Sequence, residues 1–267
     1  MLKKRGQFAV FTIMIIIIIV GFLVYLSLGK EDIKSQAVPE KERVLLTDDN
    51  NIRNFAESCV EQTSKHALFY LGFVGGNIIP DSFDKYFSYD NYFKIPYFYS
   101  EGKSKIPVPY DESYWENLLE KYIDLNLKNC INDFEAFRGI QITHGNTKSN
   151  VQFTDQEVIF NVEFPVTVTR NSQENSIAPK YIKRINLRLR DILGIVSTIV
   201  EQEVENDLYI HWDYLTDMTQ NNYNITAFTE TQNTIIYKIV DLEDKIDDEF
   251  YVFQFANKIK TVKSRNR

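Results

Sequence analysis

The sequence has few of the residues from which most catalytic and metal sites are built. Its 267 residues include three histidines and two cysteines, and no HExxH, GxSxG, GxGxxG or P-loop spacing occurs. His66, His144 and His211 are scattered along the chain, and neither cysteine has a histidine or a second cysteine beside it. We therefore predict no cofactor, no metal site and no catalytic residue, and whether the chain is an enzyme stays open.

Two polar stretches resemble parts of functional sites. His211 and Asp213 could form an acid–base pair, but a structural or solvated histidine is the preferred interpretation. The stretch DLEDKIDDE, Asp241 to Glu249, has many carboxylates but lacks the glycine that an EF-hand requires at its sharp turn. We interpret this stretch as a solvated acidic hairpin turn.

Charged residues are absent between Phe8 and Leu28. A helix of this length reaches about 30 Å, the hydrocarbon thickness of a bilayer. A cleavable signal usually has a shorter apolar core of about 7–15 residues and a small-residue cleavage site, and no such site follows here. A buried helix of a soluble protein seldom runs so far without a polar residue. We expect residues 7–29 to form a transmembrane helix that contacts the lipid bilayer through residues 8–28.

The flanking charges predict the orientation of this helix. Lys3, Lys4 and Arg5 precede it, and residues 30–32 follow it with mixed sign, so residues 1–6 should lie in the cytoplasm. The rest of the chain should then lie outside the cell, as in a single-pass signal-anchor protein. All 37 acidic residues follow residue 29, which leaves that portion with a net charge of −10 and disfavours nucleic acid as a partner.

Beyond the membrane, composition and periodicity divide the chain into three parts. Residues 30–47 are charged and lack a sustained period, which is typical of a stalk, and residues 261–267 form a basic tail. Residues 48–260 should form an extracellular α+β domain. A capping box at Ser113 and Glu116 is expected to open one of its helices. Apolar stripes at three- and four-residue spacing predict helices around 48–74, 113–134 and 192–199, and a short amphipathic piece around 208–215.

Alternation of apolar and polar residues predicts the strands. It occurs at 151–153, 158–164 and 185–189, and again in three runs near the end, 224–229, 234–242 and 249–259. The expected fold is therefore three to four helices packed on a mostly antiparallel sheet.

Cys59 and Cys130 lie on the inward stripes of two predicted helices. An even number of cysteines outside the membrane favours a disulfide. Two buried thiols that pack as small apolar side chains are the alternative. We predict the bridge. Asn224 begins the one N-x-[ST] sequon, and its predicted exterior location makes it a candidate glycosylation site.

The start of the chain, Lys3-Lys4-Arg5-Gly6-Gln7 before the apolar run, resembles a class III (type IV pilin-like) signal of archaea. The resemblance implies cleavage after Gly6 by a prepilin peptidase, which leaves the apolar helix on the mature protein. Many pilins carry a glutamate five residues after the cut, where this chain has Phe11. The resemblance therefore supports pilin-like processing, and whether the protein also has a pilin-like role in pilus assembly stays open.

Four further stretches, behind this anchor and in this order, carry a second resemblance: ESCVEQTSKHALFYLGFVGGNI, PYFYSEGKSKIP, YIDLNLKNCINDF and VIFNVEFPVTV. Together they resemble a family of single-span membrane-anchored proteins of small-genome (DPANN-type) archaea, over residues 1–260. The resemblance implies a location and a fold and carries no activity.

The function expected from these features is that of a membrane-anchored cell-envelope protein with a structural or interaction role, whose partners are envelope, pilus or secretion proteins. Two alternatives stay open. One is an anchored extracytoplasmic enzyme whose cleft collects acids distant in sequence or His211. The other is an accessory subunit of a secretion or pilus machine that binds partners through the aromatic-rich residues 86–110.

Overall fold

The computed structural model of the chain falls into two compact units, residues 1–45 and 46–267. It describes residues 48–79, 85–88, 94–137, 139–170, 172–177, 179–206, 211–231 and 233–259. The predicted processing signal, apolar segment, stalk and basic tail lie outside these residues. None of the helices in the described part is both long and apolar enough to cross a membrane.

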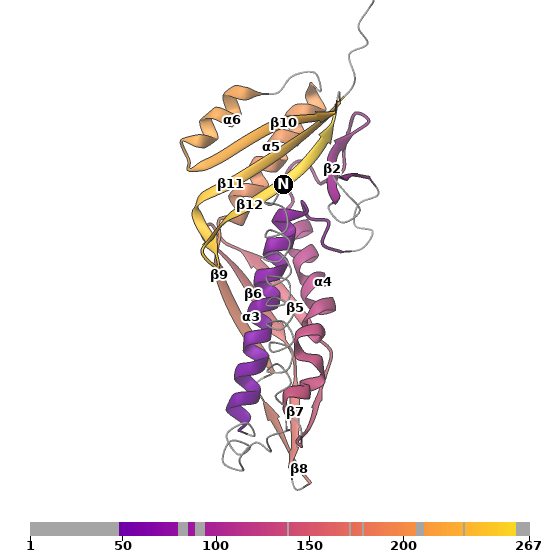
Figure 1. The fold of residues 1–267 in the computed structure, drawn as a ribbon, viewed down its shortest axis with the longest axis vertical. Helices are drawn as coiled ribbons and strands as arrows, with labels where there is room; N and C mark the ends of the chain where they lie inside the picture. Colours follow the sequence, from indigo (N-terminus) through magenta and orange to yellow (C-terminus); the bar gives the residue numbers. More distant parts are fainter. Residues whose placement is uncertain are drawn as a thin grey trace, which may run out of the picture. The chain divides into compact units, whose positions relative to one another are not determined.

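The described residues form helices and mostly antiparallel strands, which confirms the α+β class (Figure 1). The four α-helices match the three long predicted stripes and the short amphipathic piece. An irregular turn, η1, follows the second of them. The bounds are α3 (Asp49–Phe73), α4 (Glu112–Ile131), η1 (Asn132–Phe137), α5 (Leu189–Glu205) and α6 (Trp212–Thr219).

The strands form three sheets where a single one was expected. One sheet has the order β1-β2-β12-β11-β10 with β3 beside β2, and the others have the orders β4-β7-β8 and β5-β6-β9. All pairs are antiparallel except β12 and β2. The bounds are β1 (Tyr86–Ser88), β2 (Lys94–Ser100), β3 (Lys103–Ser104), β4 (Gln141–His144), β5 (Lys148–Phe153), β6 (Glu157–Glu163), β7 (Val166–Arg170), β8 (Gln173–Ile177), β9 (Lys180–Asn186), β10 (Tyr223–Thr231), β11 (Thr234–Ile246) and β12 (Glu249–Lys258).

Helix α3 begins and ends where its sequence predicts. The Asp48 side chain caps it by accepting a hydrogen bond from the Asn50 backbone N–H at 3.2 Å. After Phe73, Gly75 and Gly76 adopt φ angles of +56° and +78°, which glycine reaches without strain and which turn the chain out of the helix. The predicted apolar stripe of α3 is buried, including Ile52, Ala56, Cys59, Val60, Ala67 and Leu71.

Helix α4 begins differently from the prediction. Its cap is Asp111, which accepts from the Ser113 N–H at 3.1 Å. The expected capping box of Ser113 and Glu116 is therefore wrong. Glu116 accepts instead from the Phe153 N–H of β5 at 3.0 Å, so its carboxylate serves a neighbouring strand rather than its own helix. An aspartate two residues before Ser113 already satisfies the first free N–H groups of the helix.

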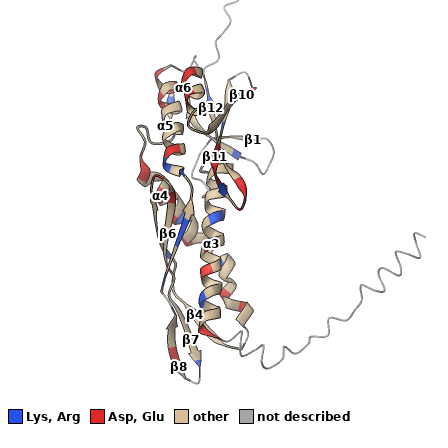
Figure 2. Cartoon of the chain, turned by 90° about the vertical axis from the view of Figure 1, so that its left-hand side faces the viewer, with Lys and Arg blue, Asp and Glu red and all other residues tan. Residues whose placement is uncertain are grey.

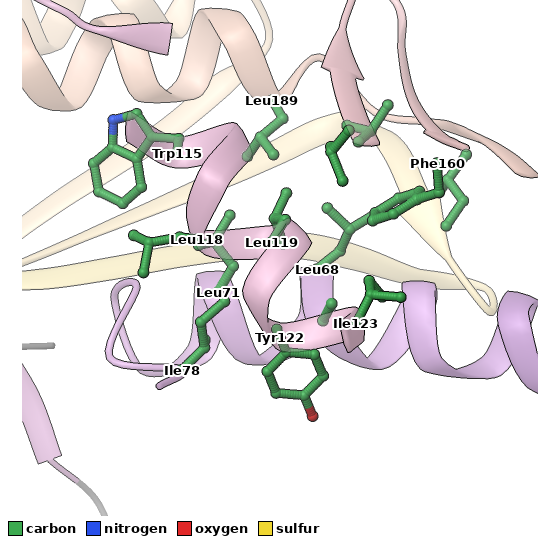
Figure 3. Packing of buried hydrophobic residues seen from close by; sticks show 14 of the residues in the cluster. Leu68, Leu71, Ile78, Trp115, Leu118, Leu119, Tyr122, Ile123, Phe160 and Leu189 are labelled. Carbon is green, nitrogen blue, oxygen red and sulfur yellow. The ribbon is translucent and has the colours of Figure 1, made fainter. Parts of the chain in front are cut away.

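Helices α3 and α4 pack together over the sheet β5-β6-β9, whose strands alternate buried and exposed residues as predicted. Leu68, Leu71, Leu118, Leu119 and Phe160 are fully or almost fully buried in this core (Figure 3). One predicted strand residue, Leu189, belongs instead to the first turn of α5.

The end of α3 lies directly against β12. A Cβ atom at Gly72 would come within 2.1 Å of the Val252 carbonyl oxygen, so only glycine allows this approach. Tyr251 donates its hydroxyl hydrogen to the Leu68 carbonyl at 3.1 Å, and Gln254 donates to the Phe73 carbonyl. The mixed sheet is thereby attached to the long helix.

Strands β11 and β12 form a hairpin whose tip returns to α3. Ile246 pairs with Glu249, and Asp247 and Asp248 between them have φ angles of +51° and +69°. Two successive positive φ angles are those of a type I′ turn, for which aspartate is a favoured residue. The prediction of a hairpin turn is therefore confirmed, and its tip places Asp247 beside Lys65 of α3.

Candidate functional site

The predicted cysteine pair joins the two long helices. Cys59 of α3 and Cys130 of α4 form a disulfide, with Cα atoms 5.5 Å apart and 71 residues between them in sequence. Cys59 is buried, whereas Cys130 is partly exposed at the end of its helix. The bridge lies close to the irregular turn η1, where the chain leaves α4.

The three histidines occupy separate places with separate partners. His66 on α3 lies 3.2 Å from the Tyr122 hydroxyl, and His144 on β4 lies 3.2 Å from an Asp133 carboxylate oxygen. His211 directly precedes α6, and Asp213 lies in the first turn of that helix. Among the residues that the structure describes, no three histidine, cysteine or acidic side chains are placed to hold a metal ion.

The acidic stretch Asp241 to Glu249 is mostly exposed, as its sequence predicts, but its first residue is not. Asp241 is fully buried, and it accepts hydrogen bonds from the Arg188 guanidinium at 2.5 Å and from the Glu243 N–H at 2.9 Å. A buried charge needs such partners, which the sequence pattern alone does not reveal. Leu242, Glu243, Lys245 and Glu249 are exposed, as is the tip at Asp247 and Asp248.

The other two predicted features have simple outcomes. Asn224 lies on β10 with an exposed side chain, so the sequon is accessible, and its modification stays a prediction. The aromatic-rich residues 86–110 contribute Phe98 and Tyr99 to the core, while Tyr86 is partly exposed. Two of the aromatic side chains in the described part of this segment are therefore buried and cannot contact a partner.

A row of carboxylates on α4 lines the outer edge of β5. Glu116, Glu120 and Asp124 follow one another at four-residue spacing on one face of the helix. They accept hydrogen bonds from the backbone N–H groups of alternate strand residues, Phe153, Val151 and Ser149, at 3.0, 2.9 and 2.8 Å. Four helical residues advance about 6.0 Å and two strand residues about 6.6 Å, so the two spacings agree. The edge of this sheet is thereby closed to further strands.

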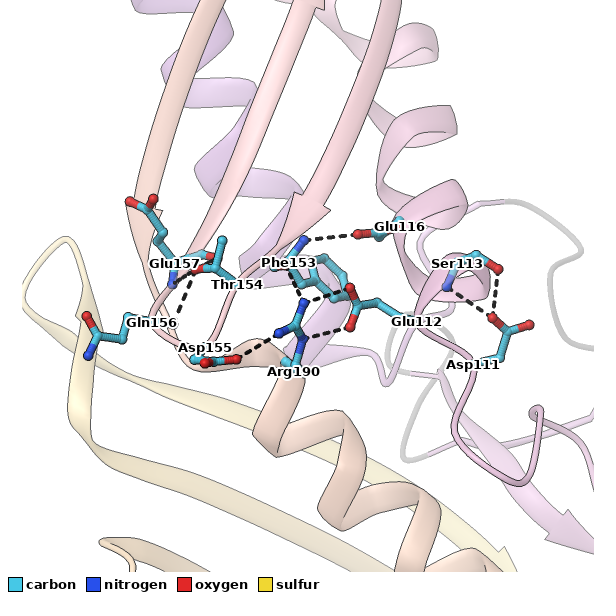
Figure 4. A network of polar contacts seen from close by, with 10 residues as sticks. All are labelled: Asp111, Glu112, Ser113, Glu116, Phe153, Thr154, Asp155, Gln156, Glu157 and Arg190. Atoms are coloured by element: carbon cyan, nitrogen blue, oxygen red, sulfur yellow. Dashed lines mark hydrogen bonds and ion pairs between the residues drawn. The ribbon is translucent and has the colours of Figure 1, made fainter.

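Arg190, at the start of α5, ties three elements together (Figure 4). Its guanidinium contacts both carboxylate oxygens of Glu112 on α4 at 2.7 and 2.9 Å. It also donates to Asp155 in the β5–β6 turn at 2.7 Å and to the Phe153 carbonyl at 2.6 Å. A planar donor that contacts a carboxylate through two nitrogens fixes orientation as well as distance. We regard this cluster as structural, because its donors and acceptors are directed at one another.

A groove of about 920 Å³ runs along α3. One wall is the exposed face of α3, and the other is formed by Lys183 of β9 and by the tip of the β11–β12 hairpin. We call it the α3 groove. Most of its lining residues are charged or polar, while Phe69 and Ile246 provide apolar surface.

Five charged side chains form a continuous chain of ion pairs in this groove, which we call the ion ladder. Lys183 bridges Glu57 and Glu61 at 2.8 and 3.3 Å, and Lys65 bridges Glu61 and Asp247 at 3.1 and 2.7 Å. Figure 2 shows acidic and basic residues following one another along α3. The ladder connects the helix to both β9 and the hairpin.

The ion ladder shifts the protonation equilibria of its members away from neutral pH. Hydrogen bonds from Lys65 and Lys183 lower the pKa of Glu61 below its ordinary value. Hydrogen bonds to Asp247 and Glu61 raise the pKa of Lys65, and a hydrogen bond to Glu57 raises the pKa of Lys183. At neutral pH these groups are charged, so they suit ionic recognition better than proton transfer.

Two smaller openings lie around Arg188, with volumes of about 710 and 700 Å³. Arg188 is held by Asp241 and Glu243, and its guanidinium lies 4.7 Å from the centre of the Tyr223 ring. Burial raises the pKa of Asp244, which accepts from the Arg188 backbone N–H at 2.7 Å. These contacts join the β9–α5 connection to β11 and account for the charged groups found there.

Of the four ion pairs in the ladder, only Glu61–Lys65 has a signal in the local sequence, and the groove itself was not predicted. Glu61 and Lys65 lie four residues apart on a helix, a spacing that favours an ion pair, and their charged atoms are 3.1 Å apart. The contacts to Lys183 and Asp247 bridge more than 100 residues of sequence, so no local pattern signals them. Phe69 lies off the apolar stripe of α3 and is 53% exposed, so its place in the sequence is a sign that could have pointed to the groove.

Comparison of the chain with models of protein families, with curated proteins and with solved structures finds no match.

Proposed function

We propose that the chain is a cell-envelope protein anchored by residues 8–28, and that residues 48–260 lie outside the cell in a structural or interaction role. The sequence supports the anchor through its length and its lack of charge, and the basic residues 3–5 support the orientation.

The observation that carries the proposal is the disulfide between Cys59 and Cys130. Disulfides persist in oxidising surroundings outside the cytoplasm and are rare inside it. The bridge thus favours, independently of the flanking charges, the same side of the membrane for the described domain.

The α3 groove supports interaction rather than catalysis. Its charged groups are bound to one another in the ion ladder, and the pKa values of Glu61, Lys65 and Lys183 are moved away from neutrality. General acid–base catalysis works best with a pKa near the operating pH. A surface of ordered, fully charged groups is suited to holding a partner.

The test is protease accessibility of the full chain carrying an epitope tag at its C-terminus. Proteinase K added to intact cells should remove the tag, while a cytoplasmic protein in the same cells stays whole. A variant that lacks residues 8–28 should stay protected, because it is not exported. Protection of the tagged full chain until the cells are lysed would contradict the proposal.

A further inference from the structure

In the ion ladder the lysine side chains are less exposed to solvent than the carboxylates. The side chains of Lys183 and Lys65 are 19% and 31% exposed, whereas those of Glu61, Glu57 and Asp247 are 43%, 46% and 68% exposed. The lysines therefore form the floor of the α3 groove, and the carboxylates face outward. A carboxylate has about four lone-pair sites, so a bond to one lysine leaves acceptor capacity toward solvent.

The groove as a whole carries a surplus of negative charge. Glu57, Glu61, Asp247 and Glu249 line it together with only two lysines. The floor lysines hold the outer carboxylates in fixed positions, which lowers the entropic cost of binding a donor from outside. The groove is thus complementary to a cationic ligand.

We propose that the α3 groove binds an extended, basic segment of a partner polypeptide. This segment has two Lys or Arg residues at positions two apart, and an apolar residue four positions from the nearer of these two basic residues. This inference rests on the interaction role proposed above and names the chemistry of the partner.

The spacing of the groove residues gives this pattern. Glu57 and Glu61 lie about 6.0 Å apart along the helix axis, and alternate residues of an extended segment lie about 6.6 Å apart. Phe69 lies about 12 Å beyond Glu61, and four extended residues cover about 13 Å. Two cations at alternate positions therefore reach the two glutamates, and an apolar side chain then reaches Phe69.

The fold itself contains the same match of spacings. On α4, Glu116, Glu120 and Asp124 meet alternate residues of the extended strand β5. The glutamates of the α3 groove have the same four-residue interval, but in the described chain they are contacted by lysine side chains rather than by the N–H groups of a strand. In the groove we expect charged side chains of the partner, rather than its backbone, to be the donors.

The apolar end of the groove provides the third contact. Phe69 is 53% exposed, and its ring stacks on that of Phe73 with centroids 5.5 Å apart and an angle of 11° between planes. The ring is therefore held in place while one face stays open. Covering it with an aliphatic side chain removes apolar surface from water.

The test is fluorescence anisotropy with the full chain in non-ionic detergent. The probe is the labelled peptide Ser-Leu-Ser-Ser-Ser-Arg-Ser-Lys-Ser-Ser-Ser-Leu-Ser, which shows the same pattern in both directions. It should bind, and its affinity should fall steadily as sodium chloride rises from about 50 to about 500 mM. A peptide with Glu in place of Arg and Lys should not bind.

Variants locate the binding. Glu249→Gln removes a groove charge that neither cation of the pattern reaches and should weaken binding less than about twofold, whereas Glu57→Gln should weaken it about fivefold. Phe69→Ala should weaken it by a similar factor without changing its salt dependence. Glu174→Gln, on β8 outside the groove, is the matched control and should bind like the native chain. Equal melting temperatures of all four variants establish that the fold is retained.

Three results would overturn the inference. The basic peptide does not bind, it binds the Glu57→Gln variant as well as the native chain, or the acidic peptide binds equally well. Displacement of the basic peptide by chitohexaose would identify the groove as a saccharide site instead. The protease experiment measures location separately, so these failures leave the proposed location standing.

Discussion

The Glu116 carboxyl is partly buried, and burial disfavours its charged form. Burial raises the pKa of this carboxyl above its ordinary value of 4.5, although the Phe153 N–H opposes the shift. Because the folded chain binds this proton more tightly than the unfolded chain, ionisation lowers the free energy of unfolding. Well below pH 4.5 the carboxyl is protonated in both states, and the free energy of unfolding is not reduced. The reduction is complete once the pH exceeds the pKa of the folded state. The Glu116 carboxylate thus lowers the free energy of unfolding through its charge, while it serves as a hydrogen-bond acceptor for the edge of β5.

Replacing Glu116 separates the acceptor from the charge. Glu116→Gln keeps an oxygen for the Phe153 N–H, so we expect a higher free energy of unfolding than the native chain at pH 7 and an equal one at pH 3. Glu116→Ala leaves the N–H without its acceptor and should lower the free energy of unfolding by about 1–2 kcal/mol. Urea titrations at both pH values measure these differences. Hydrogen exchange of the Phe153 amide should become faster in the alanine variant only.

The role of Glu116 also shows where local sequence rules fail. Ser113 and Glu116 have the spacing of a capping box, but Asp111 caps the helix. The true partner of Glu116 lies 37 residues away on a strand. A pattern four residues long contains no information about such a partner. The same applies to Asp241, whose burial depends on Arg188, 53 residues earlier.

At the scale of elements, the disulfide should stabilise the pair α3 and α4. Closing a loop of this length contributes about 4 kcal/mol on the chain-entropy model. In a Cys59→Ala and Cys130→Ala double variant, the free energy of unfolding should therefore be lower by up to about 4 kcal/mol. Urea titration without reductant measures this difference. Adding reductant should lower the free energy of unfolding of the native chain toward that of the variant. It should leave the free energy of unfolding of the variant unchanged. Free thiols in protein isolated from the envelope, detected by mass spectrometry, would show that the bridge does not form.

Arg190 should matter more than an exposed arginine, because it holds α4, α5 and the β5–β6 turn together. Lysine cannot reproduce its two-nitrogen contact with Glu112, so Arg190→Lys should lower the free energy of unfolding by about 1–2 kcal/mol. Arg184→Lys, at an exposed ion pair with Glu157, is the control and should lower it by less than about 0.5 kcal/mol. Equal decreases in the free energy of unfolding of the two variants would mean that the cluster in Figure 4 stabilises the fold no more than an exposed ion pair does.

Elements with a strong apolar period could be predicted from sequence, and the others could not. The stripes of α3 and α5 and the alternation of β6 each bury one face, so the pattern reports the structure. Strand β8 is exposed at four of its five positions, and so it has no alternation to detect. The division into three sheets depends on pairings between strands, which periodicity does not encode.

At the scale of the whole molecule, the sequence predicted a class of fold and a location, but no site. The predicted anchor rests on 21 consecutive residues, and the predicted fold class rests on summed periodicities. The α3 groove forms only when α3, β9 and the β11–β12 hairpin come together. Its residues look like an ordinary solvated helix face until Lys183 and Asp247 are placed beside them.

The N-terminal segment provides the last prediction, which concerns the mature protein. Cleavage after Gly6 would remove Lys3, Lys4 and Arg5 but none of the 21 apolar residues from Phe8 to Leu28. The new amino group at Gln7 would then carry the positive charge that keeps the cytoplasmic end inside. We therefore expect the apolar segment to stay on the mature chain with or without cleavage.

N-terminal sequencing of the native protein measures this directly. A first residue of Gln7 indicates pilin-like processing, and Met1 or Leu2 indicates an uncleaved signal-anchor. Either start retains a segment long enough to span the bilayer, so the protein should resist extraction from membranes by carbonate and dissolve in detergent. A start beyond Leu28 would mean that the segment is a removed signal. The domain would then be secreted without an anchor, although its disulfide and its groove would face the same surroundings.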